Sequence, residues 1–259
     1  MPYLTIDGRA YHYRDVGVGR PLLLLHGFPL TGASFWPQLD APPPGTRLIV
    51  PDHRGFGQSA PGAGPLTMDA IAADALALLD ALKLSRTALG GVSMGGYVAM
   101  ALLRLDPARV DRLVLIDTWC GADDEAGKAR REATAQQLER EGLDALVETM
   151  LPKLIAPRAP EALRQRLEAM MRAARPESAA AASRGMGQRT DSRELLSRFA
   201  GPALVVVGSE DPITPPAKAR EMAALMSLSR VVELEGCGHL PNLEKPEAFN
   251  AALSEFLAF

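Results

Sequence analysis

A serine between a short apolar run and a helical pattern constrains this chain more than any other feature. Residues 87–92 form the apolar run, and Ser93 stands between Gly91 and Gly95 before a helical pattern over 94–105. A serine in a sharp turn from strand to helix takes strained backbone angles, and the crowded turn leaves room only for glycine two residues to either side. Such a turn exposes the hydroxyl at the carboxyl edge of a sheet, next to the N-terminus of the helix. The pattern therefore predicts a nucleophilic serine rather than a glycine-rich turn with an incidental hydroxyl.

Predicted strands and helices alternate on both sides of this serine. Residues 3–16 indicate a β-hairpin that turns at Asp7-Gly8. Further strands are predicted at 21–25, 47–50, 87–92, 112–116, 203–207 and 230–234, and helices at 68–84, 94–105, 217–226 and 246–259. Strict alternation of this kind predicts an α/β fold with a doubly wound, mostly parallel sheet.

The alternation stops between Trp119 and Ala200. This stretch is rich in Ala, Arg, Glu and Met, has helical spacing, and is interrupted by Pro152, Pro157, Pro160 and Pro176, which predicts three or four short helices. We expect a helical cap (a lid) at 119–199, inserted into a core formed by 1–118 and 200–259 and lying above the carboxyl ends of the strands. An independent helical interaction module is the alternative.

The amino-acid composition limits the kinds of partner that this protein is expected to bind. The chain has 259 residues, of which 47% are hydrophobic, so a sizeable core is expected, and a net charge of −3 argues against nucleic acid or an anionic membrane as partner. The two cysteines, Cys120 and Cys237, are too few for a disulfide framework, and no signal peptide or membrane span is visible. We expect a cytoplasmic protein that acts on a small molecule; association with copies of itself stays open.

A serine nucleophile needs a histidine base, and the chain has only four histidines. His12 lies in the predicted hairpin, His26 and His53 follow early strands, and His239 follows the last strand. In a sheet of this kind the order along the chain is serine, acid, histidine, so the base must come late. His239 is therefore the predicted general base.

Two aspartates compete for the role of the acid that orients the base. Asp211 follows the strand that precedes the strand of His239, so the two loops should be neighbours. Asp117 follows the strand after the serine helix and is expected nearer the other side of the pocket. We favour Asp211, with Asp117 as the alternative and Glu210, which should point away if Asp211 points in, as the lesser one.

The charge that develops on a carbonyl oxygen needs two backbone N–H groups as an oxyanion hole. One is expected from Met94, directly after the nucleophile, and the other from Phe28, in the loop after the strand 21–25. The predicted substrate pocket contains Phe28 and Met94 together with His26, Gly27, Pro29, Trp36 and Trp119. No metal and no cofactor are expected in this chemistry.

The segment Asp52 to Ser59 is assigned a scaffold role. Asp52 and Arg54 follow a strand and are expected to pair beneath the floor of the site, while Gly55 and Gly57 permit the turn that follows.

Taken together, these motifs resemble the α/β-hydrolase family over 1–118 and 200–259. The motifs that carry the resemblance are His26-Gly27-Phe28-Pro29-Leu30 with Gly32 and Trp36, Asp52 to Ser59, Gly91 to Gly96, Asp211, and Gly238-His239. Within the family, the serine turn and the ending Gly-His-Leu-x-Asn-x-Glu-x-Pro-Glu-x-Phe are similar to bacterial carboxylesterases, 3-oxoadipate enol-lactonases and the cofactor-free haloperoxidases or perhydrolases. The resemblance implies the fold and a Ser93–His239–Asp211 triad, and it is weakly specific for substrate.

The expected activity is hydrolysis of small carboxylic esters through an acyl-enzyme on Ser93. Hydrolysis of an enol-lactone is the alternative within enzymes, and it would need a cationic anchor for the substrate carboxylate. A ligand sensor on the same fold is the alternative from another class, although an intact triad argues against it. The resemblance at Pro29 adds an expected side activity, the formation of peracids from hydrogen peroxide.

Overall fold

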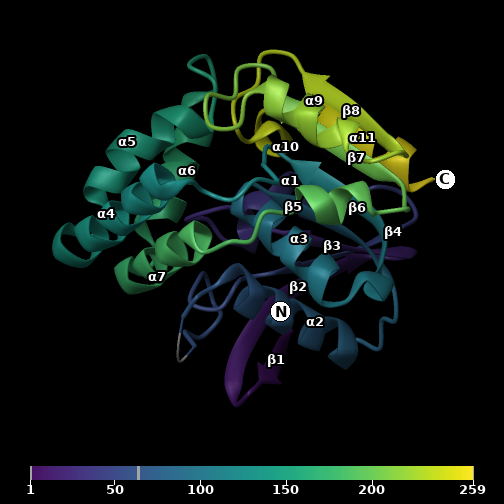
Figure 1. Cartoon of the computed structure of the whole chain (residues 1–259), viewed down its shortest axis with the longest axis horizontal. Helices are drawn as coiled ribbons and strands as arrows, with labels where there is room; N and C mark the ends of the chain where they lie inside the picture. The colour runs from purple at the N-terminus through teal and green to yellow at the C-terminus, as the bar shows by residue number, and fades with distance from the viewer. Residues whose placement is uncertain (1, 63–64, 259) are drawn as a thin grey trace.

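The computed structural model describes residues 2–62 and 65–258, which form an eight-stranded sheet flanked by helices (Figure 1). The strand order is β1-β2-β4-β3-β5-β6-β7-β8. The strands are β1 (Tyr3–Ile6), β2 (Arg9–Gly17), β3 (Arg20–Leu25), β4 (Thr46–Pro51), β5 (Thr87–Val92), β6 (Val110–Ile116), β7 (Ala203–Gly208) and β8 (Ser229–Leu234). β1 and β2 pair antiparallel, and β2 also pairs antiparallel with β4. The other pairs of neighbouring strands are parallel: β4 with β3, β3 with β5, β5 with β6, β6 with β7, and β7 with β8. The predicted mostly parallel α/β sheet is confirmed.

The central strands are buried throughout, as parallel strands covered on both faces must be. Every residue of β5 is buried, and so are Leu22 to Leu25 of β3. On the flanks, α2 (Met68–Ala81) packs against α3 (Met94–Leu105), while α9 (Pro216–Ala224) and α11 (Pro246–Leu257) contact β8. Short helices complete the core: η1 (Gly32–Phe35), α1 (Trp36–Asp40), η2 (Pro107–Arg109) and α10 (Pro241–Glu244).

Helix α2 ends earlier than its sequence pattern predicts. The apolar spacing extends the prediction to Leu84, but the helix ends at Ala81 because Lys83 takes a positive φ of 56°. The N–H of Leu84 then reaches back to the carbonyl of Leu79. Leu84 therefore packs against the core from a helix-terminating turn rather than from the helix itself.

The segment 119–199 contains five helices, one more than the largest number predicted. They are α4 (Glu125–Glu141), α5 (Asp144–Leu154), α6 (Glu161–Arg172), α7 (Pro176–Gly187) and α8 (Arg193–Ser197). Figure 1 shows α4 to α7 gathered on one side of the sheet. The division of the chain into a core and a cap stays a prediction. Among the described residues, no helix has both the length and the apolar character that crossing a bilayer requires.

Some of the prolines in this segment stand at helix boundaries, and others do not. Pro160 and Pro176 stand at the starts of α6 and α7, where the missing N–H costs nothing. Pro152 was expected to break a helix but lies inside α5, two residues before its end, so only the last turn loses a hydrogen bond. The break between α4 and α5 comes instead at Gly142, whose φ is 75°.

The expected pairing of Asp52 with Arg54 is wrong. Arg54 forms an ion pair with Asp74 of α2. The buried Asp52 carboxylate instead accepts hydrogen bonds from His12 Nδ1 at 2.8 Å and from the Gly32 N–H at 2.8 Å. It also lies 3.2 Å from Arg14 Nη1. Asp52 thus joins the hairpin of β1 and β2 to the loop after β3. This is still a scaffold role, but Arg54 is not the partner.

Candidate active site

Ser93 lies between β5 and α3 in a strained backbone conformation. Its φ is 52° and its ψ is −115°, a region that side-chain-bearing residues rarely adopt. Neighbouring groups hold it there: the Ser93 N–H donates to the carbonyl of Ile116 at 2.9 Å, and Thr118 Oγ1 donates to the Ser93 carbonyl at 2.8 Å. The turn is thus fixed to the end of β6, and it leaves the Ser93 side chain half-buried.

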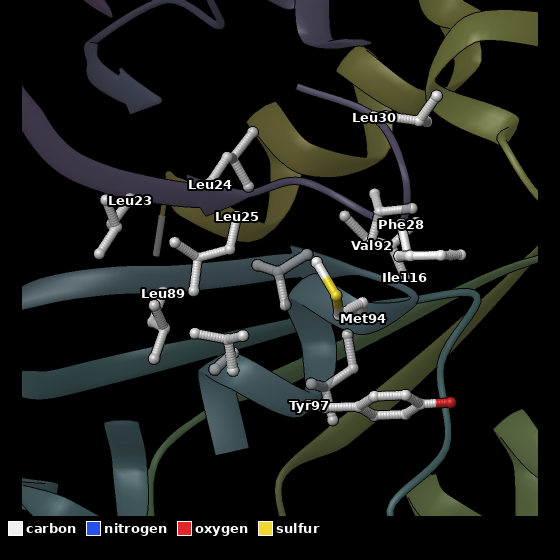
Figure 2. Packing of buried hydrophobic residues seen from close by; sticks show 14 of the residues in the cluster. Leu23, Leu24, Leu25, Phe28, Leu30, Leu89, Val92, Met94, Tyr97 and Ile116 are labelled. Atoms are coloured by element: carbon white, nitrogen blue, oxygen red, sulfur yellow. The ribbon is translucent and has the colours of Figure 1, made fainter. Parts of the chain in front are cut away.

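The glycines around Ser93 are required by the closeness of the backbone. A Cβ atom at Gly91 would lie 2.1 Å from the Gly95 carbonyl oxygen, and one at Gly95 would lie 2.0 Å from the carbonyl oxygen of Leu25. Neither distance can be tolerated. The reason for glycine that we inferred from the sequence is therefore present in the structure. Figure 2 shows the buried side chains that surround this turn, among them Leu25, Val92 and Met94.

Asp211 and His239 form a buried hydrogen-bonded pair. His239 Nδ1 lies 2.7 Å from Asp211 Oδ2, and the two side chains are almost completely buried. The same carboxylate accepts hydrogen bonds from Thr214 Oγ1 at 2.6 Å and from the Ile213 N–H at 2.8 Å. Among the described residues, His239 Nε2 has no hydrogen-bond partner. The imidazole is thus held by one nitrogen, and its other nitrogen is free to accept a proton.

The hydrogen bonds keep Asp211 ionised. Burial alone would raise the pKa of this carboxyl group, but the hydrogen bond and charge of His239, together with the Thr214 hydroxyl, lower the pKa to about 2. A carboxylate that stays charged at neutral pH can fix the tautomer of His239 and stabilise its protonated form.

Asp117, the alternative acid, lies beside this pair in a different state. Its Oδ1 accepts a hydrogen bond from the Gly208 N–H at 2.9 Å, and its Oδ2 has no partner among the described residues. Burial and the nearby charge of Asp211 raise the pKa of Asp117 well above its usual value. Both effects favour the neutral form of Asp117. Glu210, the third candidate, is partly exposed and forms an ion pair with Arg158.

Donor atoms of Asp117, Asp211 and His239 lie within 4.8 Å of one another, a grouping that could in principle hold a metal ion. The hydrogen bonds of these atoms do not fit that use. Asp211 Oδ2 already accepts from both His239 and Thr214, so a cation would have to displace both donors. The arrangement is suited to orienting a base.

The loop after β3 runs beside the serine. A Cβ atom at Gly27 would lie 3.4 Å from Ser93 Cβ, an ordinary contact, so the loop backbone borders the candidate nucleophile. Phe28 and Met94, the predicted oxyanion donors, are both buried, and among the described residues neither backbone N–H donates to a protein acceptor. An oxyanion hole needs two such N–H groups aimed at the reacting oxygen, and the assignment of Phe28 and Met94 to this role stays a prediction. The peptide bond between Phe28 and Pro29 is cis.

His26 links the backbone of this loop to the backbone of His53 through hydrogen bonds of its ring. Its Nδ1 lies 3.0 Å from the Gly27 carbonyl oxygen, and its Nε2 accepts from the His53 N–H at 3.0 Å. Burial lowers the pKa of His26 to about 4, so the ring is neutral at pH 7. Because both ring nitrogens are occupied, His26 has no free polar atom for a substrate, and its place among the pocket residues stays a prediction.

Trp36 and Trp119 border two separate hollows. The Trp36 ring packs under the Arg166 guanidinium of α6, 3.8 Å from the ring centroid, at a surface hollow of about 470 Å³. The Trp119 ring lies 4.2 Å from Lys218 Nζ and 5.5 Å from the Arg193 guanidinium. The roles of both rings in the substrate pocket also stay predictions.

Two threonines at the site were not found from the sequence. Thr214 binds the acid and Thr118 binds the carbonyl of the nucleophile. The spacing Asp-x-x-Thr from Asp211 to Thr214 could have indicated the first contact, since a hydroxyl three residues after a loop carboxylate can reach it. The contact of Thr118 crosses from β6 to β5 and has no local sequence signal.

Comparisons with known proteins agree with this geometry. A family model described as alpha/beta hydrolase fold matches residues 20–246. The solved structure of a thermophilic esterase from Thermogutta terrifontis is 37% identical, with a TM-score of 0.95, and the match covers 99% of this chain and 97% of that one. The 3-oxoadipate enol-lactonase 2 of Acinetobacter baylyi is 28% identical over 257 residues, 96% of this chain and 94% of its own. A bromoperoxidase from Bacillus anthracis is 25% identical, with a TM-score of 0.85, over 97% of this chain and 96% of that one.

Proposed function

Since the chain belongs to the α/β-hydrolase family, we propose that it is a serine hydrolase that cleaves small carboxylic esters through an acyl-enzyme on Ser93. The observation that carries the proposal is the buried pair of His239 and Asp211, in which Nδ1 is bonded to the carboxylate and Nε2 is unpartnered. The similarity to the esterase of Thermogutta terrifontis supports the choice of an ester as substrate.

In the first half of the proposed reaction, His239 Nε2 removes the proton of the Ser93 hydroxyl as its oxygen attacks the ester carbon. The N–H groups of Phe28 and Met94 stabilise the oxyanion that forms. His239 then gives its proton to the leaving alcohol. Asp211 stays ionised throughout, because its pKa of about 2 lies far below neutral pH.

In the second half, a water molecule attacks the acyl-enzyme. His239 takes the proton of the water and returns one to Ser93 as the acid product leaves, so the enzyme is restored. Every proton in this scheme is carried by a residue of this chain, and the scheme uses no metal and no cofactor. The buried free cysteines Cys120 and Cys237 take no part, and they are in keeping with the cytoplasm as the proposed location.

The test is turnover of p-nitrophenyl esters of increasing acyl length beside a lactone. Ser93→Ala and His239→Ala should each lower kcat for p-nitrophenyl acetate by at least about a thousandfold with the fold intact by circular dichroism, because each removes a member of the covalent route. Near-wild-type activity in Ser93→Ala would rule out the mechanism. Binding of an ester without turnover by the wild-type protein would favour the ligand sensor instead.

A lactone that bears a free carboxylate is the second candidate substrate. The enol-lactonase relative supports it, as do the two cations that flank Trp119, Lys218 and Arg193. If they anchor a carboxylate, Lys218→Gln should raise KM for such a lactone and leave KM for p-nitrophenyl acetate unchanged. A preference for neutral esters over this lactone favours the esterase.

Peracid formation is the proposed side activity, supported by the similarity to the bromoperoxidase and by Pro29 in the loop beside Ser93. Acetate would acylate Ser93 with loss of water, and hydrogen peroxide would then attack the acetyl carbon to give peracetic acid and free Ser93. Bromination of monochlorodimedone, with and without a chelator, measures the product. A signal that persists in Ser93→Ala would show that this route is not in use.

A further inference from the structure

Glu244 connects the loop of the candidate base to a distant segment of the chain. It is the last residue of α10 and lies five positions after His239. Its Oε1 accepts a hydrogen bond from the Gly238 N–H at 2.7 Å, and its Oε2 accepts one from the Ala156 N–H at 2.8 Å. Gly238 directly precedes His239. Ala156 belongs to the segment 155–160 between α5 and α6, which we call the connector.

The connector and the histidine loop are in direct backbone contact at this point. A Cβ atom at Gly238 would lie 2.8 Å from the Ala156 nitrogen and 2.8 Å from the carbonyl carbon of Ile155. A second contact lies nearby, because Arg158 of the connector pairs with Glu210, which directly precedes the acid. Residues from the 119–199 segment therefore touch both the base loop and the acid loop.

Only a carboxylate of this length satisfies both N–H groups. Each oxygen takes one donor, and hydrogen bonds to a charged acceptor are the stronger kind. A glutamine offers a single oxygen, so its NH2 group would face one of the two N–H donors and leave that donor unsatisfied. Burial and the charge of Glu210 raise the pKa of Glu244, while the two N–H bonds and Arg158 oppose that shift.

We propose that Glu244 is a positioning residue that sets the place of His239 and makes that place depend on the docking of the connector. The proposal rests on the proposed role of His239 as base. It predicts that a change on the connector, far from the candidate triad in sequence, slows catalysis. A displacement of a catalytic group by about 1 Å can cost on the order of a hundredfold in rate.

The experiment compares Glu244→Gln with Glu247→Gln, an exposed glutamate in the same C-terminal motif. Glu244→Gln should lower kcat for p-nitrophenyl acetate by about ten- to a hundredfold while KM changes by less than about twofold, because the substrate pocket is kept and only the base moves. Glu247→Gln should leave both constants unchanged. A loss that appeared mainly in KM, or an unchanged kcat, would overturn the proposal.

Hydrogen exchange tests the connection without reference to activity. In Glu244→Gln, peptides that cover 153–160 and 235–240 should both exchange faster, and in Glu247→Gln neither should. Faster exchange in the histidine loop alone would overturn the coupling to the connector. Should Ser93→Ala keep its activity while this exchange pattern is observed, the proposed function fails but the Glu244 connection stands.

Ala156→Pro tests the same link from the connector, since proline has no N–H to donate to Glu244. Ile155 already has the extended φ of −136° and ψ of 152° that a residue before proline needs. This variant should lower kcat by a factor similar to that of Glu244→Gln, and the double variant should lose no more than the larger single loss. Additive losses would show that the two residues act independently and would contradict the proposal.

Discussion

Two aspartates follow neighbouring strands of the sheet, yet the pKa of one is lowered and the pKa of the other is raised. Asp117 follows β6 and Asp211 follows β7, and both are buried. Asp211 accepts three hydrogen bonds, from His239, Thr214 and Ile213, and its pKa is lowered to about 2. Asp117 accepts one, from Gly208, and its pKa is raised. Donors aimed at a carboxylate, rather than depth or strand position, decide which aspartate can serve as the acid.

Replacing each aspartate by asparagine should give the largest difference in kcat between the two positions. Asp211→Asn should lower kcat for p-nitrophenyl acetate on the order of ten-thousandfold, since the amide favours the wrong imidazole tautomer; that magnitude is known from a serine protease triad. Asp117→Asn should lower it by less than about tenfold, because asparagine resembles the neutral form that the raised pKa of Asp117 favours. If the ranking is reversed, the acid is at the end of β6.

The two carboxyl groups should also have opposite effects on the pH dependence of stability. The folded-state pKa of Asp211 is about 2, below the unfolded value near 4, so its contribution to stability is present above about pH 4 and is lost as the pH falls toward 2. That contribution is on the order of 2 kcal/mol. The folded-state pKa of Asp117 is raised, so this group favours folding at low pH and costs stability as the pH rises above about 4.

Urea unfolding of both asparagine variants across pH 3 to 8 measures these contributions. Relative to the wild type, Asp211→Asn should lose stability above about pH 4, and Asp117→Asn should gain stability over the same range. If the stability of both variants relative to the wild type shifts in the same direction as the pH rises, the pKa values of the two aspartates are not shifted in opposite directions and the comparison fails.

Of the three predictions, Thr214→Val should have the smallest effect on the protein. The variant removes the hydroxyl that donates to Asp211 Oδ2 at 2.6 Å, so the pKa of Asp211 should rise and kcat should fall by about tenfold. Thr149→Val is the matched control, because its hydroxyl bonds to the Ala145 carbonyl on the exposed face of α5. An unchanged kcat in Thr214→Val would mean that His239 and the Ile213 N–H are enough to hold Asp211.

The parts of the site that follow from local geometry could be predicted from the sequence. Gly91 and Gly95 mark the serine turn because the clash that excludes a side chain there is a property of the turn itself. Asp211 could be favoured over Asp117 from strand order. The opposite pKa shifts of the two could not be foreseen, because they depend on donors and charges that only the folded chain brings together.

Most of the wrong or missing predictions concern contacts between residues that are far apart in the sequence. The partner of Arg54 is Asp74, on a helix whose packing decides the pairing, rather than the nearby Asp52. The two hydrogen bonds of Glu244 reach Gly238 and Ala156, the second of which is 88 residues away. The prolines of 119–199 predict too few helices because the chain also ends a helix at Gly142.

The positions of Ser93 and His239 along the chain have a consequence for protein synthesis. Ser93, with its strained turn, leaves the ribosome about 150 residues before His239, a delay of roughly 8 to 30 s at typical elongation rates. During that interval a nascent chain contains β3 and β5, which border the serine turn, but it lacks the imidazole of the proposed base. Because the base is translated after the serine, a chain released between the two would carry the serine turn without the proposed base.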